Sequence, residues 1–559
     1  MISLSKTDAK EDDDSKFREL IESVMPRTYT GRYGMHRYWA RKPANIVAEF
    51  IRHYSKPAEV ILDPFCGSGV TGVESLILKR KAICIDINPM AILITRMTAT
   101  RVDLRTFELA FDRVKAEVAP SLEVLYRTIC DKCGEQATMT SLIWVGDLPT
   151  RMRYSCSNCG RGVRDPTSLD RQHISKLEEV EVPYWFPTAR LFENTRINAH
   201  KGTTVADLFS RRSLIALATI FHSIDSLPES TEKELMKFTF TAALSQASKM
   251  VFVVRRRGRQ AGEIKETEGV GSRVIGYWMP KEHFEINAWN CFENRFRRVL
   301  AGKQETQRLI DDATEARSFD DLKDEATFWA LNQSATDLRR IPDDSVDYIF
   351  TDPPFGDQVP HLELDALWSA WLRFRVNYED EIVISNSPER AKSFDDYSTR
   401  LTAALRECRR VLKTNRYMSV AFHNYDLRVW HTLVSACAEI GFQIVNVLPI
   451  NNSHPSIVQL YREGGTKGAL VVTFRSGPQL EFEPTPPNIE NILIESISRT
   501  IEMLGGTAPT SRVYDTILST LIRHNSLDKE EAVERVLQER FEFWNGKWQR
   551  KRAQSSGNE

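Results

Sequence analysis

The chain has 559 residues, too many for a single compact core, so we expect two to four domains. Hydrophobic residues make up 42% and charged residues 27%, as in soluble globular enzymes, and no apolar run is long enough to cross a membrane. The acidic N-terminus lacks a secretory signal, so we predict a cytoplasmic protein without membrane contact. Because the formal net charge is −1, phosphate groups would have to be contacted by local basic clusters.

The first part of the chain alternates helical and strand patterns. Residues 1–28 are acidic and lack an apolar period, so we predict a disordered tail there. Within residues 29–100, helices are predicted at 45–54, 71–78 and 89–97, and short buried strands at 59–62 and 82–85. This alternation predicts a parallel sheet covered by helices.

A long insertion, residues 101–330, interrupts the alternation. It begins with a cysteine-paired module and continues with predicted helices at 213–226 and 234–254. The alternation resumes at Ser334, with strands at 346–350, 418–422, 444–448 and 470–474 and helices at 397–412 and 429–440. The last two strands are predicted to form an antiparallel hairpin around Gly464 and Gly465. Residues 331–478 thus complete the sheet domain, and a proline-rich linker leads into a helical module within 479–559.

The predicted strand at 59–62 runs into a glycine-rich loop, Asp63-Pro64-Phe65-Cys66-Gly67-Ser68-Gly69, which precedes a helix. Glycines let the backbone approach a ligand closely, and the next strand ends at Asp86, whose carboxylate can accept both hydroxyls of a ribose. The spacing Gly67-x-Gly69-x-x-Gly72 with Asp86 also fits a nicotinamide dinucleotide. A carboxylate at Asp63 would repel a pyrophosphate but suits the methionine ammonium of S-adenosylmethionine. We therefore predict that methyl donor, with a dinucleotide site or plain turn glycines as the alternatives.

The predicted strand at 346–350 ends in Thr351-Asp352-Pro353-Pro354-Phe355-Gly356. Two consecutive prolines fix the backbone and remove two donors, so the loop is stiff and presents free carbonyl groups. An exocyclic base amine is a poor nucleophile because its lone pair is delocalised into the ring. Hydrogen bonds from the amine to the Asp352 carboxylate and the Pro353 carbonyl make that lone pair more available, and Phe355 can stack on a base rotated out of a duplex. The loop therefore predicts methyl transfer to a base amine through Asp352, Pro353, Pro354 and Phe355; the alternative is a structural proline turn.

With these motifs the sequence resembles the amino-methyltransferases of DNA, which methylate adenine N6 or cytosine N4. Among them it looks like the adenine-specific DNA methylases that carry a zinc ribbon. Residues 36–43 (HRYWARKP) resemble the N-terminal signature of that family, residues 63–69 its cofactor loop, residues 85–89 (IDINP) its ribose-binding strand end, and residues 352–355 its catalytic tetrad. The resemblance covers about residues 31–100 and 330–475.

The resemblance implies a fold and further site residues. The fold would be α/β, a Rossmann-like, doubly wound, seven-stranded methyltransferase sheet with a zinc-ribbon and helical insertion and a helical C-terminal module. Phe65 and Asn88 would join the cofactor site, Lys42 would lie near the cofactor's carboxylate, and Asp337 near its adenine. Asp352, where a serine would favour cytosine N4, favours adenine N6. The insertion precedes Asp337 instead of coming directly before the tetrad, so the family's rules of target recognition do not transfer simply.

Four of the nine cysteines are paired, as Cys130-x-x-Cys133-Gly and Cys156-x-x-Cys159-Gly. The two pairs are separated by 22 residues. Four thiolates in this pattern suit tetrahedral zinc with no position left open for catalysis. We predict a structural zinc ribbon at about residues 128–162, because disulfides are disfavoured in the cytoplasm.

Basic and aromatic residues gather at two further places. Arginines 255, 256, 257 and 259 form one cluster, and Lys547, Arg550, Lys551 and Arg552 form another. The insertion also holds the aromatic residues Tyr184, Trp185, Phe186, Tyr277 and Trp278. A nucleic-acid groove would use such residues. Solvated surface for the charges, and packing for the aromatic rings, are the alternatives that the sequence leaves open.

The sequence as a whole predicts a DNA methyltransferase that uses S-adenosylmethionine, modifies adenine N6 and rotates the target base out of the duplex. Double-stranded DNA is the expected partner, with restriction or defence-system subunits as further candidates. Three alternatives stay open: a cytosine N4 DNA methyltransferase, an RNA base methyltransferase with a similar tetrad, and a non-catalytic DNA-binding subunit of a defence complex.

Overall fold

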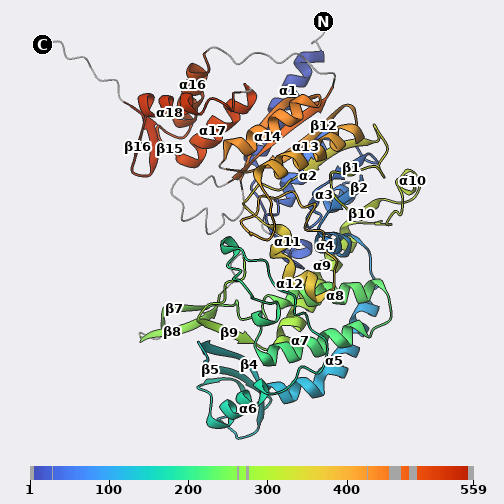
Figure 1. Cartoon of the computed structure of the whole chain (residues 1–559), viewed down its shortest axis with the longest axis vertical. Helices are drawn as coiled ribbons and strands as arrows, with labels where there is room; N and C mark the ends of the chain where they lie inside the picture. The colour runs from blue at the N-terminus through green and yellow to red at the C-terminus, as the bar shows by residue number, and fades with distance from the viewer. Residues whose placement is uncertain are drawn as a thin grey trace, which may run out of the picture.

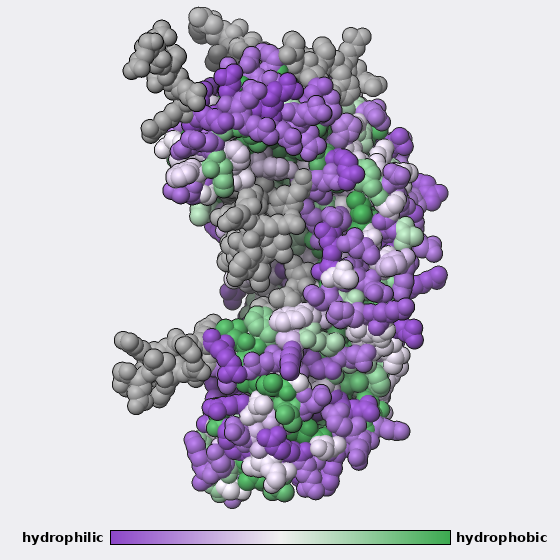
Figure 2. Space-filling model, turned by 60° about the vertical axis from the view of Figure 1, so that its left-hand side comes forward, coloured by the Kyte–Doolittle hydropathy of each residue, from purple (hydrophilic) through white to green (hydrophobic). Residues whose placement is uncertain are grey.

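The computed structural model describes residues 6–27, 29–260, 263–271, 276–424, 426–451, 468–477, 488–524 and 526–551. The molecule is elongated, with a sheet domain in its upper half, the insertion below it, and a C-terminal module beside the sheet (Figure 1). Figure 2 shows a mostly hydrophilic face that is hollowed between the sheet domain and the insertion. No helix in the described part of the chain is long and apolar enough to span a membrane.

The sheet domain is built on seven strands in the order β10-β2-β1-β11-β12-β14-β13. Neighbouring strands are parallel from β10 to β12, and β14 runs antiparallel to both β12 and β13. The predicted Rossmann-like class and the antiparallel pairing of the last two strands are confirmed; the turn at Gly464 and Gly465 lies outside the described residues. In sheet order the strands are β10 (Phe328–Asn332), β2 (Lys81–Asp86), β1 (Val60–Asp63), β11 (Val346–Thr351), β12 (Leu412–Phe422), β14 (Gly468–Ser476) and β13 (Phe442–Asn451).

Both faces of this sheet are buried, as the apolar runs in its strands predict. Successive residues of β11 point to opposite sides, so that Ile349 joins one core and Phe350 the other. Helices α13 (Phe394–Val411) and α14 (Leu427–Glu439) cover the first side. Helices α2 (Ala44–Tyr54) and α3 (Val70–Ile77) cover the second. The sheet is therefore doubly wound, and the loops after its strands are free to form a site.

The insertion combines helices with two small sheets, and its core is shared with residues 90–97 and 364–371 of the sheet domain. The expected helix at 234–254 is wrong, because α8 ends at Leu244 and the β-branched Val253 begins a strand instead. The helices are α5 (Leu104–Tyr126), α6 (Ser168–Glu178), α7 (Arg211–Asp225), α8 (Thr231–Leu244) and α9 (Ala288–Leu309). The strands are β3 (Arg127–Ile129), β4 (Gln136–Val145), β5 (Leu148–Cys156), β6 (Gly160–Arg164), β9 (Glu282–Ile286) and the hairpin β7 (Val253–Gln260) with β8 (Glu263–Val270).

The N-terminal tail departs from its prediction of disorder. Residues Lys6–Ser23 form helix α1, and Phe17 and Ile21 on it are buried. The Phe17 ring stacks on His53 of α2 with the ring centroids 3.9 Å apart. Tertiary packing of two apolar side chains thus stabilises a helix that its acidic sequence alone would not.

The C-terminal module is also less simple than the predicted helical unit. Helix α16 (Ile489–Met503) precedes β15 (Ala508–Pro509), helices α17 (Thr510–Arg523) and α18 (Glu530–Arg540), and the hairpin β16 (Phe541–Trp544) with β17 (Lys547–Arg550). This order is that of a helix–turn–helix with a β-hairpin wing. Arg523 donates a hydrogen bond to the carbonyl of Val447 in β13, so the module is docked on the edge of the central sheet.

Candidate functional site

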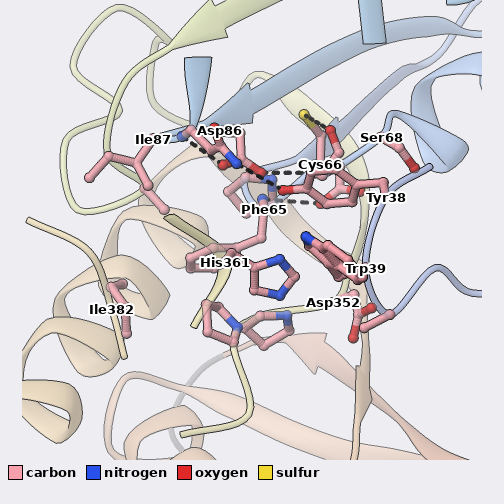
Figure 3. A pocket seen from close by; sticks show the side chains of 18 of the residues that line it. Tyr38, Trp39, Phe65, Cys66, Ser68, Asp86, Ile87, Asp352, His361 and Ile382 are labelled. Carbon is pink, nitrogen blue, oxygen red and sulfur yellow. Dashed lines mark hydrogen bonds between the residues drawn. The ribbon is translucent and has the colours of Figure 1, made fainter. Parts of the chain in front are cut away.

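The two loops singled out in the sequence lie side by side. Strands β1 and β11 are parallel neighbours, with Leu62 opposite Ile349, so the loops after them open at the same sheet edge. The Thr351 hydroxyl donates a hydrogen bond of 2.8 Å to Oδ1 of Asp63 and joins the two strand ends directly. Asp63 and Asp352 line one cavity, which holds about 990 Å³ of space including its open mouth (Figure 3).

The glycine loop is closed by the end of β2. The backbone N–H of Gly67 donates to Oδ2 of Asp86 over 2.8 Å, and that of Asn88 donates to Oδ1 over 2.9 Å. Gly67 has a φ of +50°, and a Cβ there would lie 2.8 Å from the ring of Tyr38. Because a larger residue would be strained and would collide with that ring, glycine is required where the loop meets the wall of the cavity.

Burial perturbs both carboxylates of this half of the cavity. It raises the pKa of Asp63 to about 7, against hydrogen bonds from Thr71, Thr351 and the Phe65 backbone that lower it. Burial likewise raises the pKa of Asp86 to about 6. Both carboxylates are thus only weakly stabilised in their charged form without a ligand, as expected of groups prepared for a cationic or hydrogen-bonding partner.

The proline loop is held from behind by two side chains. The Tyr397 hydroxyl donates to the carbonyl of Pro354, and the Asn424 amide donates to that of Phe355, each over 2.8 Å. No donor in the described part of the chain reaches the carbonyl of Pro353. Pro353 lines the cavity, so its unbonded carbonyl remains available to a ligand.

Asp352 has one occupied and one vacant oxygen. Its Oδ2 pairs with Nζ of Lys42 at 2.5 Å, and its buried Oδ1 has no hydrogen-bond partner. Burial raises the pKa of Asp352, and the Lys42 ammonium opposes that rise. The same ammonium lies 4.6 Å from the centre of the Phe355 ring. Lys42 therefore contacts both Asp352 and Phe355 of the predicted catalytic loop. The sequence did not predict these contacts.

The remaining wall of the cavity contains residues that the sequence analysis did not assign. His361 projects into the cavity near Phe65 and Trp39 (Figure 3). Burial, and then the Lys42 charge, lower its pKa to about 4, so its ring is neutral at neutral pH. The Tyr38 ring stacks on it at 5.7 Å. Tyr38 and Trp39 fall within residues 36–43, and the resemblance of that segment to the family signature is what could have pointed to them as site residues.

Of the other predicted cofactor residues, some line the cavity and others do not. Phe65, Gly67 and Asn88 line the cavity, although the Asn88 side chain also caps helix α4 (Pro89–Ala99) by accepting from the backbone of Met90. Gly69, with a φ of +77°, directly precedes α3 as its N-cap residue. Asp337 does not line the cavity. Its carboxylate pairs with Arg339 at 2.7 Å, and Ser334 and Ala335 occupy the wall at that end.

The family comparison agrees with this geometry. Residues 4–97 match the family model of the N6/N4 methyltransferases, described as DNA methylase. The first part of the chain is therefore similar to this DNA methylase family. None of the curated proteins compared matches the chain. The matched region includes the 36–43 signature, the glycine loop and Asp86, and it supports DNA amino-methyltransferase activity with S-adenosylmethionine as the methyl donor.

The insertion contains the predicted cysteine cluster. The four sulfur atoms of Cys130, Cys133, Cys156 and Cys159 lie within 4.8 Å of one another, and those of Cys133 and Cys156 are 3.7 Å apart. A tetrahedral zinc ion with Zn–S bonds of about 2.3 Å places its sulfur ligands about 3.8 Å apart. The four thiolates therefore fit zinc.

The glycines that follow the cysteine pairs serve this cluster. Gly134 and Gly160 adopt φ values of +75° and +72°, which allow each Cys-x-x-Cys turn to close. The cluster lies among strands β3 to β6, far along the chain from the catalytic loops. It could hold zinc as a structural element of the insertion.

The aromatic residues of the insertion mostly pack against the protein. Tyr277 is buried and donates to the carbonyls of Glu363 and Leu364, and Tyr184 stacks on His222 at 4.0 Å. Trp185 lies under Arg373, 4.0 Å from the guanidinium carbon. Arg255 pairs with Glu282 at 2.5 Å; the side chains of Arg256, Arg257 and Arg259, and the whole of Arg552, lie outside the described residues.

Proposed function

We propose that this methylase transfers a methyl group to N6 of adenine in double-stranded DNA, with the target base rotated into the cavity. One observation carries the proposal: the Oδ1 atom of Asp352 and the carbonyl of Pro353 are two vacant acceptors on consecutive residues. An exocyclic amine carries two N–H donors, so this pair of acceptors matches it in number and in kind.

The chain's own residues would prepare the amine for attack. Accepting both N–H bonds draws the amine out of conjugation with the ring, so its lone pair becomes nucleophilic. The Tyr397 and Asn424 hydrogen bonds keep the two acceptors in place, because they fix the next two carbonyls of the loop, those of Pro354 and Phe355. The Phe355 ring packs edge-on against Phe422 at 5.3 Å and presents a stacking surface for a base.

The cofactor would lie across the glycine loop. S-adenosylmethionine, when bound, supplies a methyl group on a positively charged sulfur that an incoming amine can displace. Asp63 would accept from the methionine ammonium and Asp86 from the ribose hydroxyls, since both line the cavity. Ser334 and Ala335 replace Asp337 in our proposal as neighbours of the adenine, because they line the cavity and Asp337 does not.

Adenine is proposed over cytosine because the tetrad begins with Asp352. The test is single-molecule sequencing of DNA from cells that express the wild-type chain, compared with cells that express Asp352→Ala. We expect N6-methyladenine in a recurring sequence for the wild type and none for the variant. N4-methylcytosine in its place would overturn the choice of base, and the absence of any modified base would overturn the proposed activity on DNA.

A further inference from the structure

Arginines supply three of the five residues that line a second cleft. It lies along helix α9, and its wall consists of Gln246, Asn294, Arg295, Arg297 and Arg298. No carboxylate is among these residues. Glu293, the nearest acidic neighbour in sequence, pairs with Lys115 at 3.6 Å and with Arg297 at 3.4 Å. The cleft therefore offers donors and positive charge, as an anion site does.

Arg295 is buried in the wall of this cleft and is held there by hydrogen bonds. Its side chain is only 5% exposed, and Nη1 donates to the carbonyls of Gly34 and Met35 over 3.2 and 3.3 Å. Its Nε is buried and has no partner. A buried guanidinium that keeps one N–H unpaired is costly unless a ligand completes its hydrogen bonds.

Two further arginines concentrate the charge. Burial lowers the pKa of Arg295 to about 10, and the charges of Arg298 and Arg37 lower it further. Burial, followed by Arg298, also lowers the pKa of Arg37. Arg298 is exposed and makes no hydrogen bond or ion pair with any residue that the structure describes. Three guanidinium groups that destabilise one another are stabilised by an anion, and the planar guanidinium fork matches a phosphate.

One short segment, residues 34–39, links the cleft to the cavity. Arg295 binds the carbonyls of Gly34 and Met35 in this segment, and Tyr38 and Trp39 at its other end line the cavity. Helix α9 packs against both α4 of the sheet domain and α8 of the insertion (Figure 1). An anion in the cleft would therefore be held between the two halves of the molecule.

We propose that this cleft binds a backbone phosphate of the DNA, close to the nucleotide whose base enters the cavity. The inference rests on the proposed function, since it assumes a nucleic-acid substrate. Arg298 and the unpaired Nε of Arg295 contact the phosphate, and Nη1 of Arg295 holds the segment that carries Arg37. The cleft thus positions the backbone and does not read the sequence.

The test measures how salt affects binding of a labelled DNA duplex of mixed sequence by fluorescence anisotropy. Each phosphate contact contributes about 0.9 to the slope of log K against log salt concentration. We expect Arg298→Gln to reduce the magnitude of that slope by about 0.9 and Arg298→Lys to restore part of it. Arg308→Gln is the matched control, because Arg308 is an exposed arginine on the same helix outside the cleft and should leave the slope unchanged.

The outcomes separate this inference from the proposed function. Equal slopes for Arg298→Gln and Arg308→Gln, in a wild-type protein that binds and methylates the duplex, would overturn the phosphate site and leave the methylase intact. A wild-type protein with no duplex affinity would overturn the proposed function itself. Calorimetry with inorganic phosphate tests whether the cleft binds free phosphate instead of DNA. If Arg298→Gln abolishes phosphate binding but leaves the DNA salt slope unchanged, the cleft is a site for free phosphate and the DNA assignment is overturned.

Discussion

Replacing Asp352 by asparagine tests the arrangement of acceptors more sharply than removing the side chain. Lysine can only donate hydrogen bonds, and Nζ of Lys42 lies 2.5 Å from Oδ2 of Asp352. In Asp352→Asn the amide oxygen must therefore turn toward Lys42, which leaves the NH2 group facing the cavity. A donor would then meet the donors of the base amine at the position where Oδ1 is now vacant.

The cost of this reversal follows from ordinary hydrogen-bond energies. Losing a hydrogen bond to a charged acceptor costs about 1.5–3 kcal/mol, and a buried donor left without a partner costs about 1–3 kcal/mol more. A total of about 3–5 kcal/mol in the transition state corresponds to a loss in kcat of about 10²–10⁴-fold. Lys42 and Asp352 are 7% and 22% exposed, so solvent screens the pair only partly.

The assay is the transfer of tritiated methyl groups to DNA at saturating S-adenosylmethionine. Adding Lys42→Met to Asp352→Asn frees the amide to turn its oxygen toward the cavity, so the double variant should be more active than Asp352→Asn alone. Saturating cofactor separates this effect from any weaker binding caused by the loss of Lys42. A kcat for Asp352→Asn within tenfold of the wild type, or a double variant no more active than the single one, would refute the reasoning.

Three further predictions concern the cofactor half, packing and the cysteine cluster. Because protonation removes the charge that attracts an ammonium, cofactor affinity measured by calorimetry should fall as pH drops through about 7, the pKa of Asp63, and this dependence should vanish in Asp63→Asn. A Cβ at Gly72 would lie 2.3 Å from Sγ of Cys84, so Gly72→Ala should cost about 1–3 kcal/mol in urea unfolding, and Cys84→Ala should restore most of it; a fully stable single variant would contradict this packing. Metal analysis should find zinc in the wild type and not in Cys156→Ser, whose unfolding midpoint should be lower; equal zinc contents would contradict the site.

The sequence predicted those parts of the site that depend on local patterns. The glycine loop and the proline loop follow apolar strands, and parallel neighbouring strands bring their ends together, so Asp63 and Asp352 line one cavity. The cysteine cluster was equally local, because paired spacing defines it. Each prediction needed only a short segment of the sequence and one general rule, either that loops after parallel strands meet at one sheet edge or that paired cysteines bind zinc.

The contacts that cross the chain could not be predicted in this way. Lys42 and Asp352 are 310 residues apart, and no periodicity links them. Tyr397 and Asn424 support the proline loop from a helix and from a strand end that carry no motif. The edge strand β10 was missed because it starts at Phe328, inside the predicted insertion, and is recognisable only by its pairing with β2.

The central claim is that the Asp63 and Asp352 loops divide one reaction between them, the first binding the methyl donor and the second preparing the amine. The most direct test measures cofactor binding by calorimetry and methyl transfer to DNA on the same preparations of Asp352→Ala and Asp63→Ala. The account predicts that Asp352→Ala binds S-adenosylmethionine as the wild type does but transfers no methyl groups, whereas Asp63→Ala loses binding. Sustained methyl transfer by Asp352→Ala would contradict it.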